Sequence, residues 1–163
     1  EDCTIFALAN ATGEPYGVVA ARANQLLADA EWRGAADRRD PQRAIKEHGL
    51  VGGEVVLMAE IFGKSEVVTR TGFPGVLKGK RPILTCIITA GENGSSGRHE
   101  VVLTKTFTYQ GETWYEMMNS GSQQRCHVRD AELAVLLYEN GVAFTRDMSQ
   151  IPRIPGAGGD RGP

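Results

Sequence analysis

The sequence is poor in the features that mark membrane proteins, nucleic-acid-binding proteins and disulfide-stabilised domains. No apolar run approaches the roughly 18–20 residues that a membrane-spanning helix needs. Asp and Glu total 20 and Lys and Arg total 18, so the net charge of −2 offers no basic excess for a nucleic acid or an anionic membrane. The three cysteines, Cys3, Cys86 and Cys126, are an odd number, so at least one thiol is unpaired within the chain.

Motifs for metals and nucleotides are missing as well. The chain has no CxxC or HxxxH pair, no glycine-rich phosphate loop and no dinucleotide fingerprint. Cys126 and His127 are adjacent, but neighbours in a strand point to opposite faces and could not easily bind one metal ion. Cys86 lies within an apolar run, so we expect it in the core. We therefore predict neither a metal ion nor a cofactor.

The length and composition indicate one globular domain. The chain has 163 residues, of which 41% are hydrophobic and 23% are charged. We place the domain at residues 1–147. Residues 148–163 are rich in Pro and Gly and lose all periodicity, so they form either an extended linker or a docked irregular segment. Because the chain starts at Glu1 without a Met, we expect a fragment, a processed product or a domain of a longer polypeptide.

The first half of the chain has the spacing of helices. Apolar residues recur three and four positions apart over residues 4–11 and 16–32, which predicts two amphipathic helices. Shorter helices are predicted over residues 41–48 and 54–62. Residues 72–75, Gly-Phe-Pro-Gly, read as a turn.

The second half changes to the spacing of strands. Residues 83–89 are rich in β-branched side chains and predict a buried strand, and residues 99–109 and 113–118 predict two more in an antiparallel meander. A helix over residues 130–140 and a last strand over 142–145 follow. Helices first and an antiparallel sheet afterwards predict an α+β fold.

Cys3, His99 and Asn119 are the residues whose placement suggests chemistry. Cys3 directly precedes an apolar helix, so its sulfur would lie at the helix N-terminus, where the dipole and free N–H groups favour a thiolate. His99 opens one strand of the predicted hairpin and Asn119 follows the next. These positions share one end of the hairpin. We therefore expect the imidazole and the amide side by side, as a catalytic base and its orienting group require.

Three segments resemble the papain-like cysteine peptidases. They are Asp-Cys-Thr at residues 2–4, Gly-x-His-x-Val-Val-Leu at residues 97–103 and Trp-Tyr-x-x-x-Asn-Ser-Gly at residues 114–121. The Gly-Lys-Arg-Pro segment at residues 79–82 resembles the turn that, in the compact branch of that superfamily, leads into the strand before the catalytic His. This branch includes bacteriocin-processing double-glycine peptidases and the papain-fold domains of bacterial effectors and toxins. The resemblance covers residues 2–145 and implies a papain-like fold.

Carried over position by position, the resemblance implies a Cys-His-Asn triad. Cys3 would be the nucleophile, His99 would take the thiol proton and later protonate the leaving group, and Asn119 would hold the imidazole in its productive tautomer. The backbone N–H of Cys3 would supply one oxyanion donor. The family's second donor, a Gln upstream of the Cys, has no counterpart, because only Glu1 and Asp2 precede Cys3. The compact branch more often has Asp at the third position, so Asn119 is closer to the papain pattern.

The resemblance implies a thiol-dependent amide hydrolase, in the first place a cysteine protease that cleaves a protein or peptide. It further implies an effector or toxin domain of a larger bacterial protein that is secreted or delivered, with an inhibitor or immunity protein as a second partner. Side-chain deamidation of glutamine and transglutamination use the same triad, and the sequence does not separate them from proteolysis.

Two other classes of function stay open at this point. One is a catalytically inactive papain-fold module that binds a partner, which the missing Gln favours. The other is a structural metal-binding domain, which would need stoichiometric zinc. A Cys near a helix start is commonly a small buried hydrophobe and Asn-Ser-Gly is common turn chemistry. The order and topology of the three residues therefore carry the catalytic hypothesis. The loop at residues 91–97 would then border the active-site cleft.

Overall fold

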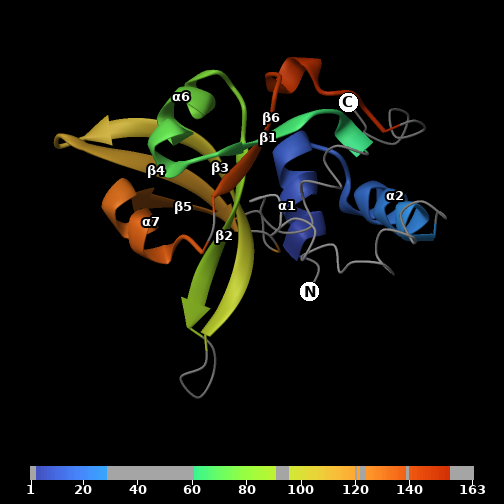
Figure 1. Ribbon diagram of the computed structural model, residues 1–163, viewed down its shortest axis with the longest axis horizontal. Helices are drawn as coiled ribbons and strands as arrows, with labels where there is room; N and C mark the ends of the chain where they lie inside the picture. The colour runs from blue at the N-terminus through green and yellow to red at the C-terminus, as the bar shows by residue number, and fades with distance from the viewer. Residues whose placement is uncertain are drawn as a thin grey trace.

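The computed structural model describes residues 3–28, 61–90, 96–119, 121, 124–138 and 140–154. It shows an α+β fold in which N-terminal helices pack on a six-stranded antiparallel sheet, as the sequence predicts. Figure 1 shows α1 (Cys3–Thr12) and α2 (Tyr16–Ala28) on one side of the sheet and α6 (Phe73–Lys78) and α7 (Asp130–Leu136) on the other. The predicted helix over residues 41–48 lies outside the described residues, as does all but the end of the one over 54–62.

The two N-terminal helices form where the apolar spacing predicts them. Helix α1 spans Cys3–Thr12 and buries its Ala and Leu side chains against the sheet, and α2 spans Tyr16–Ala28. Between them the chain reverses at Gly13, whose φ of 76° is a left-handed conformation that glycine adopts without strain. The Gly13 N–H donates to the Ala9 carbonyl at 2.9 Å, which ends α1 with a satisfied backbone group.

The sheet has the strand order β1-β6-β2-β3-β4-β5, and every pair is antiparallel. The strands are β1 (Ser65–Val68), β2 (Ile83–Ala90), β3 (Ser96–Tyr109), β4 (Glu112–Asn119), β5 (Arg125–Arg129) and β6 (Gly141–Phe144). Strands β2 to β5 form the meander, and β6 inserts between β1 and β2. The predicted strands correspond to β2, β3, β4 and β6.

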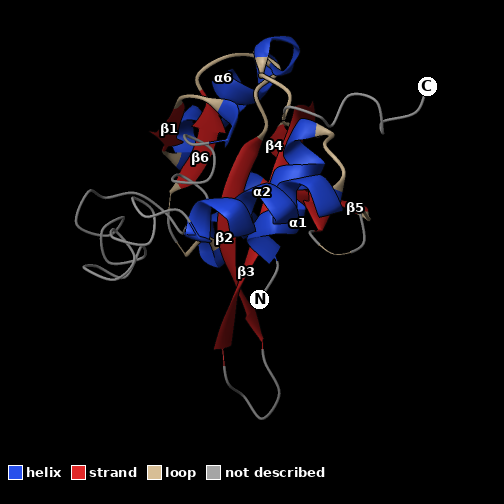
Figure 2. Ribbon diagram, turned by 90° about the vertical axis from the view of Figure 1, so that its right-hand side faces the viewer, coloured by secondary structure: helices blue, strands red, loops and turns tan. Residues whose placement is uncertain are grey.

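Alternation along the strands divides the core between the two faces of the sheet. The α1 face packs against α1 and α2; its buried strand residues are Leu84, Val102, Met118, Val142 and Phe144. The α7 face packs against α6 (Phe73–Lys78) and α7 (Asp130–Leu136); its buried strand residues are Val68, Ile83, Ile87, Val101, Leu103, Tyr115, Val128 and Ala143. In Figure 2, α1 and α2 lie in front of the strands.

Four elements, α6, α7, β1 and β5, differ from the sequence prediction. Residues 72–75 were expected to form a turn, but Phe73 begins α6, with Pro74 in the first helical turn, where its missing N–H costs nothing. The helix predicted to reach residue 140 ends at Leu136. Leu137 instead bridges to Ile87, and the Tyr138 N–H donates to the Cys86 carbonyl at 2.9 Å. The free edge of β2 thus competes with the last helical turn. Strands β1 and β5 were not predicted.

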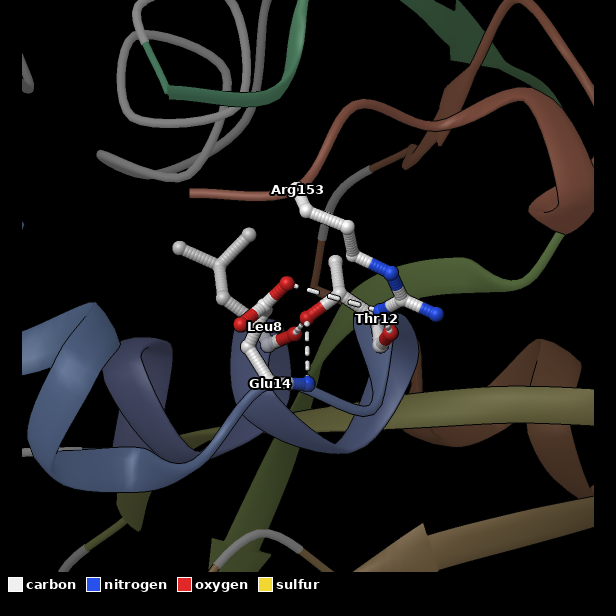
Figure 3. Close-up of polar contacts among 4 residues, drawn as sticks. All are labelled: Leu8, Thr12, Glu14 and Arg153. Atoms are coloured by element: carbon white, nitrogen blue, oxygen red, sulfur yellow. Dashed lines mark hydrogen bonds and ion pairs between the residues drawn. The ribbon is translucent and has the colours of Figure 1, made fainter. Parts of the chain in front are cut away.

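Residues 148–154 dock on the α1 side of the molecule. Ile151 and Ile154 are buried in the core of the α1 face, which fits the docked alternative for this part of the tail. The Arg153 guanidinium donates to the Thr12 carbonyl at 2.8 Å and lies 3.4 Å from the carboxylate of Glu14 (Figure 3). Glu14 is 4% exposed, so this cation balances a carboxylate that burial would otherwise destabilise.

The buried Thr85 hydroxyl destabilises the core. Thr85 is fully buried on the α7 face, and its Oγ1 has no hydrogen-bond partner among the described residues. A methyl group in the same place needs no partner. Thr85→Val should therefore raise the free energy of unfolding by about 1 kcal/mol, measured by urea denaturation. The matched control is Thr106→Val, because the Thr106 hydroxyl donates to the Trp114 carbonyl at 3.0 Å and its loss should not stabilise. Equal changes in the free energy of unfolding for the two variants would contradict the conclusion that the Thr85 hydroxyl lacks a hydrogen-bond partner.

Gly141 is required by packing. A Cβ at this position would lie 2.5 Å from Ile83 Cγ2 and 3.0 Å from the Phe73 ring. Gly141→Ala should lower the free energy of unfolding by about 1–3 kcal/mol through overpacking. Gly75→Ala is the control, because a Cβ there meets nothing within 4 Å. In the helix α6 this second change should stabilise by about 0.5–1 kcal/mol. Thermal melts of both variants test these opposite changes in stability. A Gly141→Ala protein as stable as the native sequence would contradict the packing requirement.

Candidate active site

His99 and Asn119 lie side by side at the end of the β3–β4 hairpin. The His99 Nε2 and the Asn119 Oδ1 are 2.6 Å apart. Asn119 pairs with Val101 in the β3–β4 register, and His99 is two residues earlier on the same side of β3. The imidazole therefore reaches the amide as a diagonal neighbour on one face of the sheet, and the expectation that the hairpin brings these two side chains together is confirmed.

The hydrogen bond selects one form of the imidazole. An amide oxygen can only accept a hydrogen bond, so the proton must be on His99 Nε2. In the neutral ring this leaves the lone pair on Nδ1. The nitrogen that could act as a base therefore points away from Asn119, which is the division of roles that a base and its orienting amide need.

Main-chain contacts hold Asn119 in place. Its N–H donates to the Gln124 carbonyl at 2.9 Å across the turn between β4 and β5. Its carbonyl accepts from the Asn10 side-chain amide at 3.4 Å. Asn10 belongs to α1, so this contact connects the helix that starts at Cys3 with the strand that carries Asn119. No local sequence pattern marks Asn10, because its partner is 109 residues away.

Cys3 is the first residue of α1, as the sequence predicts, and its thiol is free and half-buried. Helix α1 packs on the α1 face. Both His99 and Asn119 belong to the α7 face, because His99 is opposite Ile87 and Asn119 is opposite Val101. Among the described residues, no hydrogen bond joins Cys3 to His99. The structure thus brings together two members of the predicted triad and leaves the third at the start of a helix that runs alongside β3 on the other face (Figures 1 and 2).

Strand β3 extends past the end of β4. Strand β4 ends at Asn119, opposite Val101, whereas β3 continues back to Ser96. At the level of His99 no described strand pairs with the β4 side of β3. A side chain on the α1 face can approach the imidazole only around this edge.

Glu100 is a buried carboxylate that the sequence analysis missed. It is 4% exposed and lies opposite Cys86, on the face that α1 covers. Strict alternation in the His-Glu dipeptide could have revealed it, since a strand that turns His99 to one face turns Glu100 to the other. Glu100 is therefore a buried titratable group of β3 on the same face as the helix that starts at Cys3.

The remaining cysteines and histidine do not form a metal site in the described part of the chain. Cys126 is exposed and opposite Met117 on the α7 face, while His127 is opposite Glu116 on the α1 face. The two neighbours thus point to opposite sides, as predicted. No group of three or more metal-ligating side chains occurs among the described residues. Helices in that part of the chain are also too short or too polar to cross a membrane.

A second polar cluster on the α7 face is structural. The Tyr115 hydroxyl donates to Asp130 Oδ1 at 3.0 Å, and the other oxygen of that carboxylate pairs with Arg70. Burial, and then the hydrogen bond to Asp130, raise the pKa of Tyr115 above its ordinary value of 10.0. The cluster joins β4, the first turn of α7 and the segment before α6.

The raised pKa of Tyr115 gives a pH dependence with a definite sign. Because the folded-state pKa exceeds the unfolded value of 10.0, the stabilisation is complete below pH 10 and is lost as the pH rises further. The free energy of unfolding should therefore fall above about pH 10, and more steeply in the native sequence than in Tyr115→Phe. Denaturant titrations on both proteins at a series of alkaline pH values measure this. Identical slopes would contradict the burial of an un-ionised Tyr115.

Comparisons with known proteins identify no relative of this chain. No family model, no curated protein and no solved structure matches this chain. The function therefore has to be argued from the geometry of the described residues.

Proposed function

We propose that this chain is a thiol-dependent amide hydrolase with a papain-like Cys-His-Asn triad, acting on a protein or peptide. The observation that supports it best is the 2.6 Å contact between His99 Nε2 and Asn119 Oδ1. A histidine oriented by an amide is a common partner of a cysteine nucleophile. Cys3 is the nucleophile in this proposal, because it is the thiol at the start of α1, the place that the resemblance to papain-like peptidases gives to the nucleophile.

The reaction would proceed by acyl transfer. His99 Nδ1 takes the proton of the Cys3 thiol, and the thiolate attacks the substrate carbonyl carbon. The backbone N–H of Cys3 donates to the oxyanion. The C–N bond then breaks, and His99 returns the proton to the leaving amine, which leaves a thioester on Cys3. Water, deprotonated by His99, hydrolyses the thioester and regenerates the thiol and the neutral imidazole.

The edge of β3 beyond the end of β4 sets the geometric condition for this chemistry. By the pairing register His99 is on the α7 face, whereas Cys3 starts a helix that packs on the α1 face. The thiol must therefore meet Nδ1 at the edge of β3 beyond the end of β4. A substrate carbonyl would enter at the same place, between the start of α1 and the β2–β3 hairpin.

Several reactions share this mechanism and belong to the same proposal. Peptide cleavage releases a main-chain amine, glutamine deamidation releases ammonia, and transglutamination replaces water by an amine. We give peptide cleavage first place. In line with the resemblance to papain-fold effectors and toxins, we further propose that the chain is a domain of a bacterial protein that is secreted or delivered. An inhibitor or immunity protein would block its activity.

A non-catalytic binding module is the second candidate, and one observation favours it. His99 is on the α7 face and α1, which starts at Cys3, packs on the other face. A module that binds through its surface does not need these two residues to meet. The missing Gln upstream of Cys3 points the same way. In this alternative the contact between His99 and Asn119 only closes the end of the hairpin.

Limited alkylation of the thiols separates the two candidates. At about pH 6 an ordinary thiol, with a pKa near 8.5, is almost entirely protonated and reacts slowly with iodoacetamide. A thiolate paired with an imidazolium reacts fast. The proposal predicts rapid labelling at Cys3 alone, seen by intact mass and peptide mapping, and a loss of about tenfold or more in His99→Ala. Asn119→Ala should lower the rate by a smaller factor.

His127→Ala is the matched control, because His127 is an exposed histidine on β5 whose removal should leave the labelling of Cys3 unchanged. Cys126, the exposed thiol, serves as the internal reference for ordinary reactivity. Equal rates at Cys3 and Cys126, insensitive to His99, would reject the hydrolase and favour the binding module.

A further inference from the structure

Strand β5 forms one edge of the sheet. It is last in the strand order, and on its outer side no described strand pairs with it. Edge strands carry unpaired backbone groups and are the usual place where a second chain adds to a sheet. The sequence of β5, Arg-Cys-His-Val-Arg, contains two arginines, a histidine and no acidic residue.

The phase of the β4–β5 ladder shows which backbone groups face outward. The Asn119 N–H donates to the Gln124 carbonyl, so these two residues form a hydrogen-bonded pair. In an antiparallel ladder such pairs alternate with pairs that are not hydrogen-bonded. By the register, Cys126 and Val128 are then bonded to β4. The N–H and C=O groups of Arg125 and His127 point to the open edge, whereas the N–H of Arg129, on the same side of β5, donates to the Glu132 carboxylate at 3.2 Å.

The same three residues present their side chains on one face. They are opposite Met118, Glu116 and Trp114, which places them on the α1 face, beyond the area that α1 covers. Their outward backbone groups and their cationic or titratable side chains therefore repeat together at every second residue. An added strand would set its own alternate side chains beside them.

The arginines retain donors for a partner. Arg125 pairs with Glu116 at 3.2 Å, and Arg129 pairs with Glu132 at 3.0 Å and, more loosely, with Glu112 at 3.8 Å. The side chains of the two arginines are 55% and 43% exposed. A guanidinium has five N–H donors, so these contacts leave several of them directed to solvent.

Aromatic rings adjoin the middle of the edge. The Phe107 and Trp114 rings stack at 6.2 Å, and Phe107 meets His127 edge-on at 5.0 Å. Phe107 is 38% exposed and His127 is also exposed. A ring placed opposite His127 by an added strand would extend this stack by one member.

We propose that β5 binds an extended acidic peptide segment of a partner protein, which adds to the sheet as an antiparallel strand. Its carboxylates lie opposite Arg125 and Arg129, and an aromatic side chain lies opposite His127. The peptide pattern is acidic-x-aromatic-x-acidic, with backbone hydrogen bonds to Arg125 and His127 and an ion pair to the Arg129 side chain. The proposal is independent of the activity of Cys3.

Amide hydrogen exchange on the full chain tests this phase. The probe is a blocked synthetic peptide, Thr-Glu-Thr-Tyr-Thr-Glu-Thr, and its counterpart has Lys in place of both Glu residues. On adding the acidic peptide, exchange should slow at the amides of Arg125 and His127, and stay unchanged at Cys126 and Val128. The lysine peptide should bind with an affinity about tenfold or more lower than that of the acidic peptide. Added salt should reduce this difference in affinity.

Two variants separate backbone pairing from charge. His127→Pro removes an N–H that faces the open edge and leaves the bonds to β4 intact, so the protein should fold and lose the peptide. His127→Thr keeps that N–H and should retain backbone pairing. If His127→Pro does not fold, the double variant Arg125→Glu, Arg129→Glu decides, and it should prefer the lysine peptide. Equal affinity for both peptides in the native sequence, or no protection at the amides of Arg125 and His127, would overturn the proposal and leave the arginines as protection against edge-to-edge association.

Discussion

The pairing of β3 with its two neighbours is the constraint on which the rest of the structure depends. Val101, Val102 and Leu103 are all buried, so β3 contributes to the cores on both faces of the sheet. Because side chains alternate, the burial of these residues fixes the side to which every other residue of the strand points. A shift of one residue would turn the apolar set of each face toward the other. The core thus determines where the polar end of β3 presents His99.

This constraint has a direct consequence for the chemistry. The same alternation that turns His99 toward Asn119 turns Glu100 toward α1. The imidazole and its orienting amide are therefore built by the hairpin alone, whereas the thiol comes from a helix packed on the opposite face. In the proposed mechanism the two meet at the edge of β3 beyond the end of β4.

Much of the fold could be predicted from the sequence, and the reasons are local. Apolar spacing predicted α1 and the start of α2, and β-branched runs predicted β2, β3 and β4. Strand β5 was missed because its five residues include only one aliphatic side chain, and β1 because it has four residues. Helix α6 begins with Phe-Pro-Gly, which is also turn chemistry, and α7 ends early because Leu137 finds a backbone partner on β2. These features depend on contacts between distant segments, which no local pattern encodes.

The candidate site shows the same division. The nearness of His99 and Asn119 followed from hairpin geometry, since both flank one end of two consecutive strands. The face on which they lie did not, because it depends on the packing of Ile87 and Val101 against α7 and α6. The contact from Asn10 to the Asn119 carbonyl likewise joins segments that only the fold brings together.

The most direct test of the account is the tautomer of His99. Long-range ¹H–¹⁵N correlation spectra of the neutral imidazole distinguish the nitrogen that carries the proton from the one that carries the lone pair. The account predicts a proton on Nε2 and a lone pair on Nδ1, with the preference weakened when Asn119 is replaced by Ala. A neutral His99 that carries its proton on Nδ1 would contradict the hydrogen bond to Asn119 and, with it, the proposed base.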